Sequence, residues 1–164
     1  MKQMIKLLLT ALITTFIISG CGSDLAAKRE KDVAGADSIL VGVPVPLEFA
    51  RSNTKFLQGV ELALADLNTE GINGKKFEIQ IADDAGNFKT AVDIAQEFSQ
   101  NTRMVAVIGH WFSDICIPVA NIYEEAGMLT IVPTVSNPEL TEKGYRYIIQ
   151  SIINDKKIAA EMCA

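Results

Sequence analysis

The chain has 164 residues, of which 49% are hydrophobic, and its 15 basic and 20 acidic side chains give a formal net charge of −5. This length is enough for one domain with a sizeable core. The acidic balance and the absence of a lysine and arginine cluster exclude a nucleic-acid-binding protein, because phosphate contacts need clustered basic side chains.

The first twenty residues have the features of a secretory signal. Residues 1–6 carry two lysines and no acid, and residues 7–18 are apolar apart from threonines. This apolar run is too short to span a bilayer, which needs about 20 residues, but it fits the hydrophobic region of a signal peptide. Without residues 1–20 the chain keeps 13 basic and 20 acidic side chains, a net charge of −7.

The apolar run closes on Ile18-Ser19-Gly20-Cys21, which resembles the bacterial lipobox. The resemblance implies cleavage before Cys21 and acylation of both its thiol and its new amino group. Two or more acyl chains give stable anchoring, so we expect a lipoprotein on the outer side of the cytoplasmic membrane or in the periplasm. The alternative is a signal peptide with an incidental cysteine.

Residues 21–37 are small or charged and contain no aromatic side chain. Such a stretch buries too little apolar surface to become ordered. We therefore predict a flexible tether between the lipid anchor and a domain that begins at residue 38.

Four strands are predicted after this tether. Residues 39–45 form a continuous apolar run typical of a strand buried on both faces, and residues 104–109 and 129–135 repeat the pattern. Residues 77–81 alternate apolar and polar side chains instead. That alternation indicates a strand with one wetter face, nearer the edge of a sheet.

Three helices are predicted between the strands. Apolar residues recur at helical spacing over residues 56–67, 88–98 and 115–123. Residues 52–54 offer three candidate N-caps for the first of these helices. Pro118 is tolerated only in a first turn, which predicts that the third helix begins shortly before it.

Strands that alternate with helices in this way predict an α/β fold, a doubly wound parallel sheet with helices on both faces, in one lobe over residues 38–144. Sheets of this kind bind ligands at the carboxyl ends of their strands. The sequence has no GxGxxG, GxxxxGK[ST] or GxSxG motif. These absences argue against a dinucleotide-binding protein, a P-loop NTPase and an α/β-hydrolase, and no cofactor is predicted.

No catalytic residue and no metal site is predicted either. His110 could act as a base for Cys116 or Asp114, but a lone histidine at a strand end is more often a structural hydrogen-bonding group, and no third group orients it. Residues 83–84 are two aspartates at a strand end, a pattern typical of a turn. Cys116 and Cys163 lie in no zinc or CxxC spacing, and each is expected to pack as a small apolar residue unless the two form a disulfide.

Three blocks of the sequence resemble the periplasmic branched-chain amino-acid binding proteins of ABC importers. They are FLQGVELALADLNTEGINGKKFEIQIADDAGNFKTAVDIAQEF, VAVIGHWFSDICIPVANIYEEAGMLTIVPTVSNPELT and GYRYIIQS. The resemblance runs from about residue 39 to the C-terminus and rests on the order and spacing of the blocks. It implies a type I periplasmic binding fold, in which two lobes hold an amino acid or related solute between them. It also implies an ABC permease as the partner, and no enzymatic activity.

The resemblance implies four ligand-binding residues. In the family a hydroxyl residue shortly after IGH meets the carboxylate of the amino acid, and here that residue is Ser113. A helix N-terminus at this position favours the same anion. After the fourth strand, Thr134 would offer its carbonyl to the ammonium of the ligand and Ser136 its hydroxyl and N–H, while Trp111 would form a wall of the cleft.

Each of these residues also has an ordinary structural interpretation. Ser113 suits an N-cap, Ser136 suits a turn, and Trp111 suits buried packing. Gly86 and Phe112 stand where many relatives have a cysteine pair. The loop after the first strand lacks the Ser-Gly and the tyrosine that relatives often use to line the pocket. These departures leave the solute open among an aliphatic amino acid, an aromatic acid, an amide and a short peptide.

The family is about twice as long as this chain. We therefore expect residues 145–164 to be the crossover into a second lobe and the start of its first helix, with the rest of that lobe missing. The sequence thus predicts an N-terminal fragment of a solute-binding lipoprotein. Two alternatives stay open: a ligand-sensing domain of a signalling system, and a non-functional product of a truncated gene. A lipid anchor alone argues against the sensor, because it cannot carry a signal across a membrane.

Overall fold

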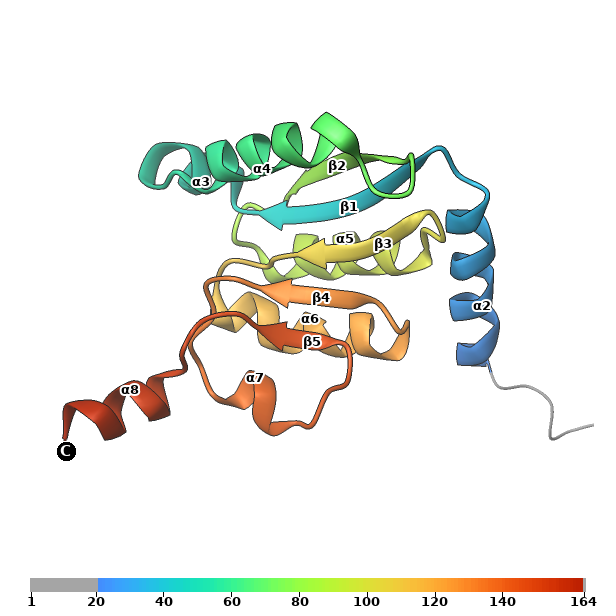
Figure 1. Cartoon of the computed structure of the whole chain (residues 1–164). Coiled ribbons are helices and arrows are strands. Elements are labelled where there is room, and N and C mark those ends of the chain that lie inside the picture. Colours follow the sequence, from blue (N-terminus) through green and yellow to red (C-terminus); the bar gives the residue numbers. More distant parts are fainter. Residues whose placement is uncertain (1–20, 164) are drawn as a thin grey trace, which may run out of the picture.

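Five parallel strands form a single sheet in the order β2-β1-β3-β4-β5. In Figure 1 all five arrows point toward the same edge of the sheet. The computed structural model describes residues 21–163, so the predicted signal peptide in residues 1–20 and the side chain of Cys21 lie outside what is described. No helix within this part of the chain is both long and apolar enough to cross a membrane.

The predicted strands are all present and one more is added. The strands are β1 (Ser38–Val45), β2 (Lys76–Asp83), β3 (Met104–Ile108), β4 (Leu129–Val132) and β5 (Ile148–Gln150). The strand predicted from alternation, β2, lies at an edge of the sheet as expected, because only β1 pairs with it. The fold class predicted from the sequence is confirmed.

The helices are α2 (Cys21–Ala34), α3 (Leu47–Asn53), α4 (Phe56–Glu70), α5 (Phe88–Gln100), α6 (Ser113–Glu125), α7 (Glu139–Glu142) and α8 (Asp155–Met162). Helices α4, α5 and α6 were predicted with nearly these bounds. Helix α4 ends where Gly71 takes a positive φ of 77° and donates its N–H to Leu67 O. Helices α3 and α7 were not predicted, since each is only four to seven residues long.

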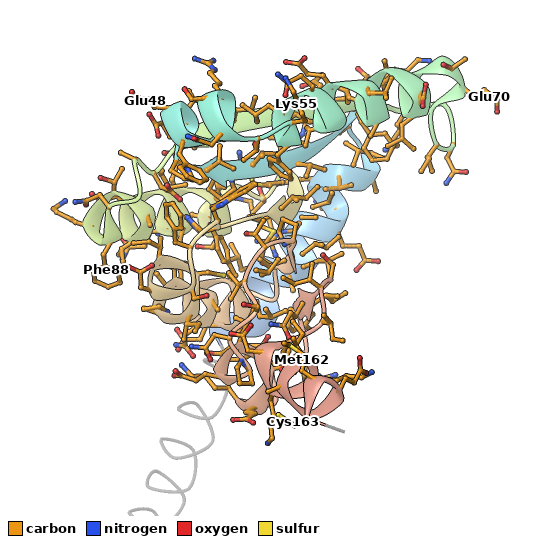
Figure 2. The ribbon with its side chains drawn as sticks, turned by 90° about the vertical axis from the view of Figure 1, so that its left-hand side faces the viewer. Glu48, Lys55, Glu70, Phe88, Met162 and Cys163 are labelled. Carbon is orange, nitrogen blue, oxygen red and sulfur yellow. The ribbon has the colours of Figure 1, made fainter. Side chains whose placement is uncertain are left out.

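The helices cover the two faces of the sheet unequally. Helices α5 and α6 pack together on one face and form the main core with β3, β4 and β5. On the other face α4 covers β1 and β2, and Figure 2 shows it at the top of the molecule, opposite α5. Leu129 and Ile149 lie on the part of this face beyond α4 and are 39% and 49% exposed.

A glycine in β1 lets α5 approach the sheet closely. A Cβ added at Gly42 would lie 2.6 Å from ring atoms of Phe98 and 2.8 Å from the sulfur of Met104. Both neighbours are buried, Phe98 to 99% and Met104 completely. Any larger residue at position 42 would therefore push α5 off the centre of the sheet.

Two local predictions were wrong. The N-cap of α4 is Lys55, although Thr54 Oγ1 accepts a hydrogen bond from Phe56 N at 3.2 Å, and residues 52–53 belong to α3 instead. Pro118 is the sixth residue of α6 rather than a first-turn residue. Burial of Ile117 and Val119 against the main core outweighs the backbone hydrogen bond that the proline cannot make.

The predicted flexible tether is also wrong, because residues 21–34 form helix α2. Within it, Arg29 is buried and donates hydrogen bonds to Ser99 O at 2.8 Å and to Ala126 O at 3.0 Å. Thr102 donates to Asp32, and Lys75 Nζ donates to the last carbonyls of the helix. These polar contacts hold α2 against the amino edge of the sheet. Composition alone could not predict them, because their partners lie far away in the sequence.

The predicted lobe boundary at residue 144 falls too early. Strand β5 pairs with β4 through Thr130 and Ile148, Ile131 and Ile149, and Val132 and Gln150. The lobe therefore extends at least to residue 150. Helix α8 follows as predicted, with Asn154 as its side-chain N-cap, but none of its residues is buried, and Figure 1 shows it projecting away from the sheet.

We expect Arg29→Ala to lower the free energy of unfolding by about 1–3 kcal/mol, because two buried carbonyl groups lose their hydrogen-bond donor. Urea denaturation measures this loss. Lys28→Ala is the matched control, since Lys28 is an exposed cation on the same helix. Equal stabilities of the two variants would contradict the docking of α2 through Arg29.

Candidate functional site

The strand order reverses next to β1, and this reversal positions the candidate site. Connections from β1 lead to β2 on one side, while β3 lies on its other side. The chain segments that leave β1 and β3 therefore diverge at the carboxyl edge of the sheet. Doubly wound folds bind their ligands in the crevice at such a switch point. Figure 2 views the molecule from this edge.

A cavity of about 460 Å³ lies at this switch point. Its lining comes from the segment after β1, the turn after β2 and the loop after β3. The lining residues are Pro46, Glu48, Phe49, Ser52, Asn53, Asp83, Ala85 and Phe112. Sequence reasoning missed most of them, because the order of strands decides which loops meet and no local pattern contains that order.

Ser113 is the first residue of α6 and is half-buried. Its N-cap interpretation is wrong, because Phe112 occupies the N-cap position. Ser113 instead lies in the first turn, where a helix leaves N–H groups without an internal partner and favours negative charge. It is adjacent in sequence to Phe112, which lines the cavity.

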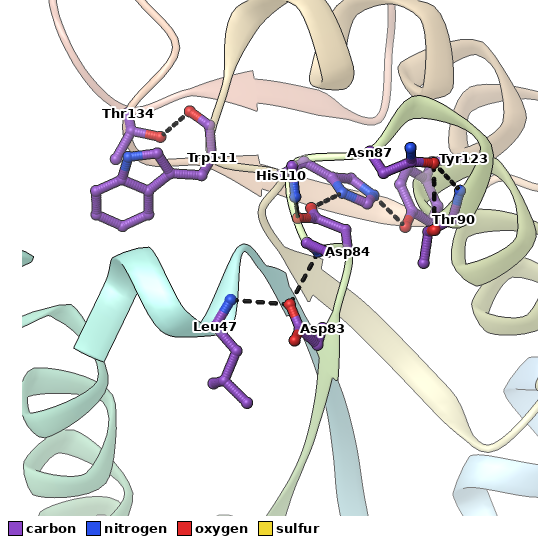
Figure 3. Close-up of polar contacts among 11 residues, drawn as sticks. Leu47, Asp83, Asp84, Asn87, Thr90, His110, Trp111, Tyr123 and Thr134 are labelled. Atoms are coloured by element: carbon purple, nitrogen blue, oxygen red, sulfur yellow. Dashed lines mark hydrogen bonds and ion pairs between the residues drawn. The ribbon is translucent and has the colours of Figure 1, made fainter. Parts of the chain in front are cut away.

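Thr134 and Trp111 are brought together by a direct contact. The hydroxyl of Thr134 donates a hydrogen bond of 2.7 Å to the backbone carbonyl of Trp111, as Figure 3 shows. This bond joins the loop after β4 to the loop after β3. The indole ring of Trp111 is half-buried and meets Phe49 and Phe56 edge-on, with centroid distances of 6.0 and 5.3 Å.

Ser136 takes a different position from the other three candidates. Its backbone carbonyl accepts a hydrogen bond of 2.9 Å from Asp155 N, at the start of α8. None of Trp111, Ser113, Thr134 and Ser136 lines the 460 Å³ cavity itself. The structure thus joins Trp111 to Thr134 and places Ser113 one residue from the cavity, while Ser136 contacts the segment that leaves the lobe.

The two adjacent aspartates organise the turn after β2, as predicted. Asp83 accepts hydrogen bonds from Leu47 N at 2.9 Å and from Ala85 N at 2.8 Å. Asp84 accepts one from Gly86 N at 2.9 Å. Among residues 21–163, no group of three or more His, Cys, Asp or Glu side chains is placed to hold a metal ion.

His110 has an orienting partner, which corrects the expectation that it has none. Its Nδ1 lies 2.7 Å from Asp84 Oδ2 and its Nε2 lies 3.2 Å from the hydroxyl of Tyr123. The histidine and aspartate side chains are 0% and 1% exposed. Figure 3 shows His110 next to Trp111 and in contact with both Asp84 and Tyr123.

The groups around His110 are poorly suited to nucleophilic chemistry. Burial raises the pKa of the Cys116 thiol to about 12, although a hydrogen bond from the backbone of His110 opposes this shift. Burial also raises the pKa of Tyr123 well above its usual range. Cys116 is a free, buried thiol, as its predicted packing role requires, whereas Cys163 is free and exposed, contrary to expectation.

Gly86 and Phe112 lie in contact across two loops. A Cβ added at Gly86 would lie 3.3 Å from Phe112 Cε2, and Gly86 has a positive φ of 62°. The phenylalanine ring therefore packs directly against the turn after β2. This contact brings the turn after β2 and the loop after β3 together at the cavity.

Comparisons with known proteins agree on one family. The profile described as periplasmic binding protein matches residues 38–161. An amino acid binding protein of Pseudomonas aeruginosa is 36% identical over 109 residues, which are 65% of this chain and 29% of that protein. The Leu/Ile/Val-binding protein of Escherichia coli K12 is 35% identical over 138 residues, which are 82% of this chain and 36% of that protein.

Solved structures give the same result. The ABC transporter substrate-binding protein of Desulfitobacterium hafniense in complex with Leu is 37% identical, with a TM-score of 0.72 over 76% of this chain and 37% of that one. A branched-chain amino acid substrate-binding protein, LivJ of Streptococcus pneumoniae, in complex with isoleucine, is 24% identical and shares the fold, with a TM-score of 0.65 over 72% of this chain and 34% of that one. The chain spans about a third of the length of the relatives it matches.

We expect a thiol reagent at pH 8 to modify Cys163 and to leave Cys116 unmodified in the folded protein, because Cys116 is buried and stays protonated. Mass spectrometry after peptide cleavage locates the label in a soluble form that begins at Gly22. Denaturation before labelling is the control and should expose both thiols. Rapid labelling of Cys116 in the native protein would contradict its burial.

The raised pKa of the Cys116 thiol also predicts a loss of stability at alkaline pH. The pKa of Cys116 in the folded protein, about 12, lies above the ordinary value of 9.0, so the unfolded chain releases this proton at a lower pH than the folded protein. The stability that the thiol contributes is therefore complete below pH 9.0 and is lost as the pH rises toward 12. Denaturation curves across this range measure the loss. Cys116→Ala should reduce the loss, and an unchanged alkaline slope in that variant would contradict the shift.

Proposed function

The chain belongs to the periplasmic binding protein family, and from this premise we propose that it is the amino-acid-binding lobe of the solute-binding protein of an ABC importer. The observation that supports this most is that the family profile spans all five strands of the lobe. The switch-point cavity and its flanking loops lie within the same region. Binding followed by delivery to a permease, rather than catalysis, is the activity proposed.

The carboxylate of the amino acid binds at the start of α6 in this proposal. Ser113 supplies its hydroxyl there, and the first turn of the helix supplies N–H groups and a favourable dipole. Half-burial of Ser113 supports this placement, since a partly desolvated site strengthens hydrogen bonds to an anion. Phe112 as N-cap makes no side-chain hydrogen bond to the helix, so the N-cap side chain does not occupy these N–H groups, although Asp114 adds a negative charge to the same turn.

The ammonium and the side chain of the ligand then lie toward the neighbouring loops. The carbonyl of Thr134 and the hydroxyl of Ser136 accept from the ammonium, while Trp111 bounds the cleft. The hydrogen bond from Thr134 to Trp111 supports this arrangement, because it fixes the two loops relative to one another. Phe49 and Phe112 give the adjoining cavity an apolar wall that suits an aliphatic side chain.

Catalysis is a weaker interpretation of the same groups. His110 and Cys116 are buried, and the thiol is protonated at neutral pH. A substrate would have to reach them through the core, whereas the candidate ligand loops lie at the surface of the lobe. We therefore propose a binding protein without enzymatic activity, metal or cofactor.

We further propose that ligand binding needs a second lobe facing the carboxyl edge. The relatives are about three times as long as the matched region, and their ligands are held by proteins of that length. Translating the gene beyond codon 164 in all three frames tests this part of the proposal. Unrelated sequence after an ordinary stop codon would favour a degenerate or repurposed lipoprotein instead.

We expect Ser113→Ala to raise the Kd for L-leucine roughly tenfold to a hundredfold, since a hydrogen bond to a charged group contributes about 1.5–3 kcal/mol. Titration calorimetry with the protein encoded by the whole gene measures this change. Ser52→Ala is the matched control, because Ser52 lines the cavity but is not proposed to bind the carboxylate. Weakened binding in Ser52→Ala alone would move the ligand from the α6 terminus into the cavity.

We also propose that the protein is anchored through lipid on Cys21, outside the cytoplasmic membrane. Cys21→Ser is expected to abolish detergent-phase partitioning and the mass increase from acyl chains, because the serine hydroxyl replaces the acylated thiol. Phase separation and mass spectrometry of the mature protein measure both. Cys163→Ser is the control and should leave anchoring unchanged, so membrane release in both variants would contradict a specific lipid site.

A further inference from the structure

Three polar side chains from three elements meet in a fully buried row beside the candidate ligand loops. Asp84 follows β2, His110 follows β3 and Tyr123 lies on α6. We propose that this row positions the loop after β3 for ligand binding, so that His110 and its two partners act on the ligand only through Trp111 and Ser113. The ligand part of this inference rests on the proposed function, whereas the effect on the loop does not.

The carboxylate of Asp84 connects His110 to the turn after β2. Its Oδ2 lies 2.7 Å from His110 Nδ1, and its Oδ1 accepts from Gly86 N at 2.9 Å. The backbone of Asp84 is fixed as well, since its N–H donates to Val45 O at 3.1 Å and its carbonyl accepts from Asn87 N at 2.8 Å. Asp84 is therefore tied to the ends of both β1 and β2.

The other side of the imidazole is held by α6. Because a carboxylate oxygen only accepts hydrogen bonds, Nδ1 of His110 carries the proton of that contact. Nε2 pairs with the Tyr123 hydroxyl at 3.2 Å, and the two rings lie 6.1 Å apart. Both ring nitrogens of the buried histidine are thus used, which fixes the plane of the ring.

The fixed imidazole ring lies at the start of the loop that carries Trp111 and Ser113. Only Trp111 and Phe112 separate His110 from Ser113, so a rotation at His110 moves the ligand-binding residues directly. Hydrogen bonds from Gly109 N to Ile131 O and from Thr134 Oγ1 to Trp111 O also hold this loop. Both of these lead to β4, so the Asp84 contact is the polar link between the loop and β2.

The chain carries its own reporter for this arrangement. Trp111 is the single tryptophan of the sequence and follows His110 directly. Its ring packs against Phe49 and Phe56. A displaced loop would expose the indole to water, which shifts its fluorescence emission to longer wavelength and increases quenching by acrylamide.

Asp84→Asn tests the proposal with little change in shape. An amide has one acceptor oxygen where the carboxylate uses two, so the variant can accept from Gly86 N or from His110 Nδ1–H but not from both, and keeping both contacts would require the imidazole proton to move to Nε2. We expect red-shifted Trp111 emission, stronger acrylamide quenching and a roughly tenfold rise in the Kd for L-leucine in the protein encoded by the whole gene.

Met128→Ala is the control for general destabilisation. Met128 is fully buried in the main core at the amino end of β4, away from the loop. Its substitution should lower the melting temperature without changing Trp111 emission. Identical Trp111 emission and quenching in Asp84→Asn and the unchanged protein would overturn the proposal, and so would equal changes in Asp84→Asn and Met128→Ala.

Two further measurements keep the outcomes distinct. Tyr123→Phe retains the ring and removes the hydroxyl, so it should shift Trp111 emission in the same direction to a smaller extent. Unchanged Trp111 emission in Tyr123→Phe would overturn the proposed role of the contact between His110 and Tyr123. Absence of leucine binding by the unchanged protein would refute the proposed ligand, while the Trp111 readout would still decide whether the row positions the loop.

Discussion

The parallel pairing of β1 with both β2 and β3 is the constraint on which the rest of the lobe depends. It makes β1 and β3 neighbours although their onward connections leave in opposite directions, from β1 to β2 and from β3 to β4. The resulting crevice is a property of the backbone topology rather than of any one side chain. Gly42 makes this arrangement tight, because only a residue without a side chain lets Phe98 and Met104 pack onto the middle of β1.

Once the strands are ordered in this way, polar contacts determine how the loops lie. Asp83 fixes the start of α3 and the turn after β2 through two backbone N–H groups. Asp84 links that turn to His110, and Thr134 links the next loop to Trp111. Asp84 and His110 are removed from water, so each of these two side chains is costly to leave unpaired. Hydrogen bonds consequently connect the loops at the carboxyl edge to one another.

The sequence predicts the regular elements of this lobe well and its site only in part. Continuous apolar strands and helical periodicity depend on neighbouring residues, so β1 to β4 and α4 to α6 could be read directly. Helix α3 and the cavity beside it depend on which strands become neighbours, and no local pattern states that. The orienting role of Asp84 was missed for the same reason, since 26 residues separate it from His110.

Helix α2 shows how far a compositional argument can mislead when a single buried contact decides the outcome. Its residues are mostly small or charged, so burial of apolar surface alone would leave them unfolded. Arg29 nevertheless donates hydrogen bonds to two carbonyls at the C-terminal ends of α5 and α6. Cations are favoured at such ends by the helix dipole as well as by the free carbonyls. Because this contact lies at the amino edge of the sheet, α2 meets the lobe on the side opposite the switch-point cavity, as Figure 1 shows for α2 and the strand arrows. An attachment through the N-terminal end of the chain therefore leaves the carboxyl edge, with its candidate ligand loops, uncovered by α2.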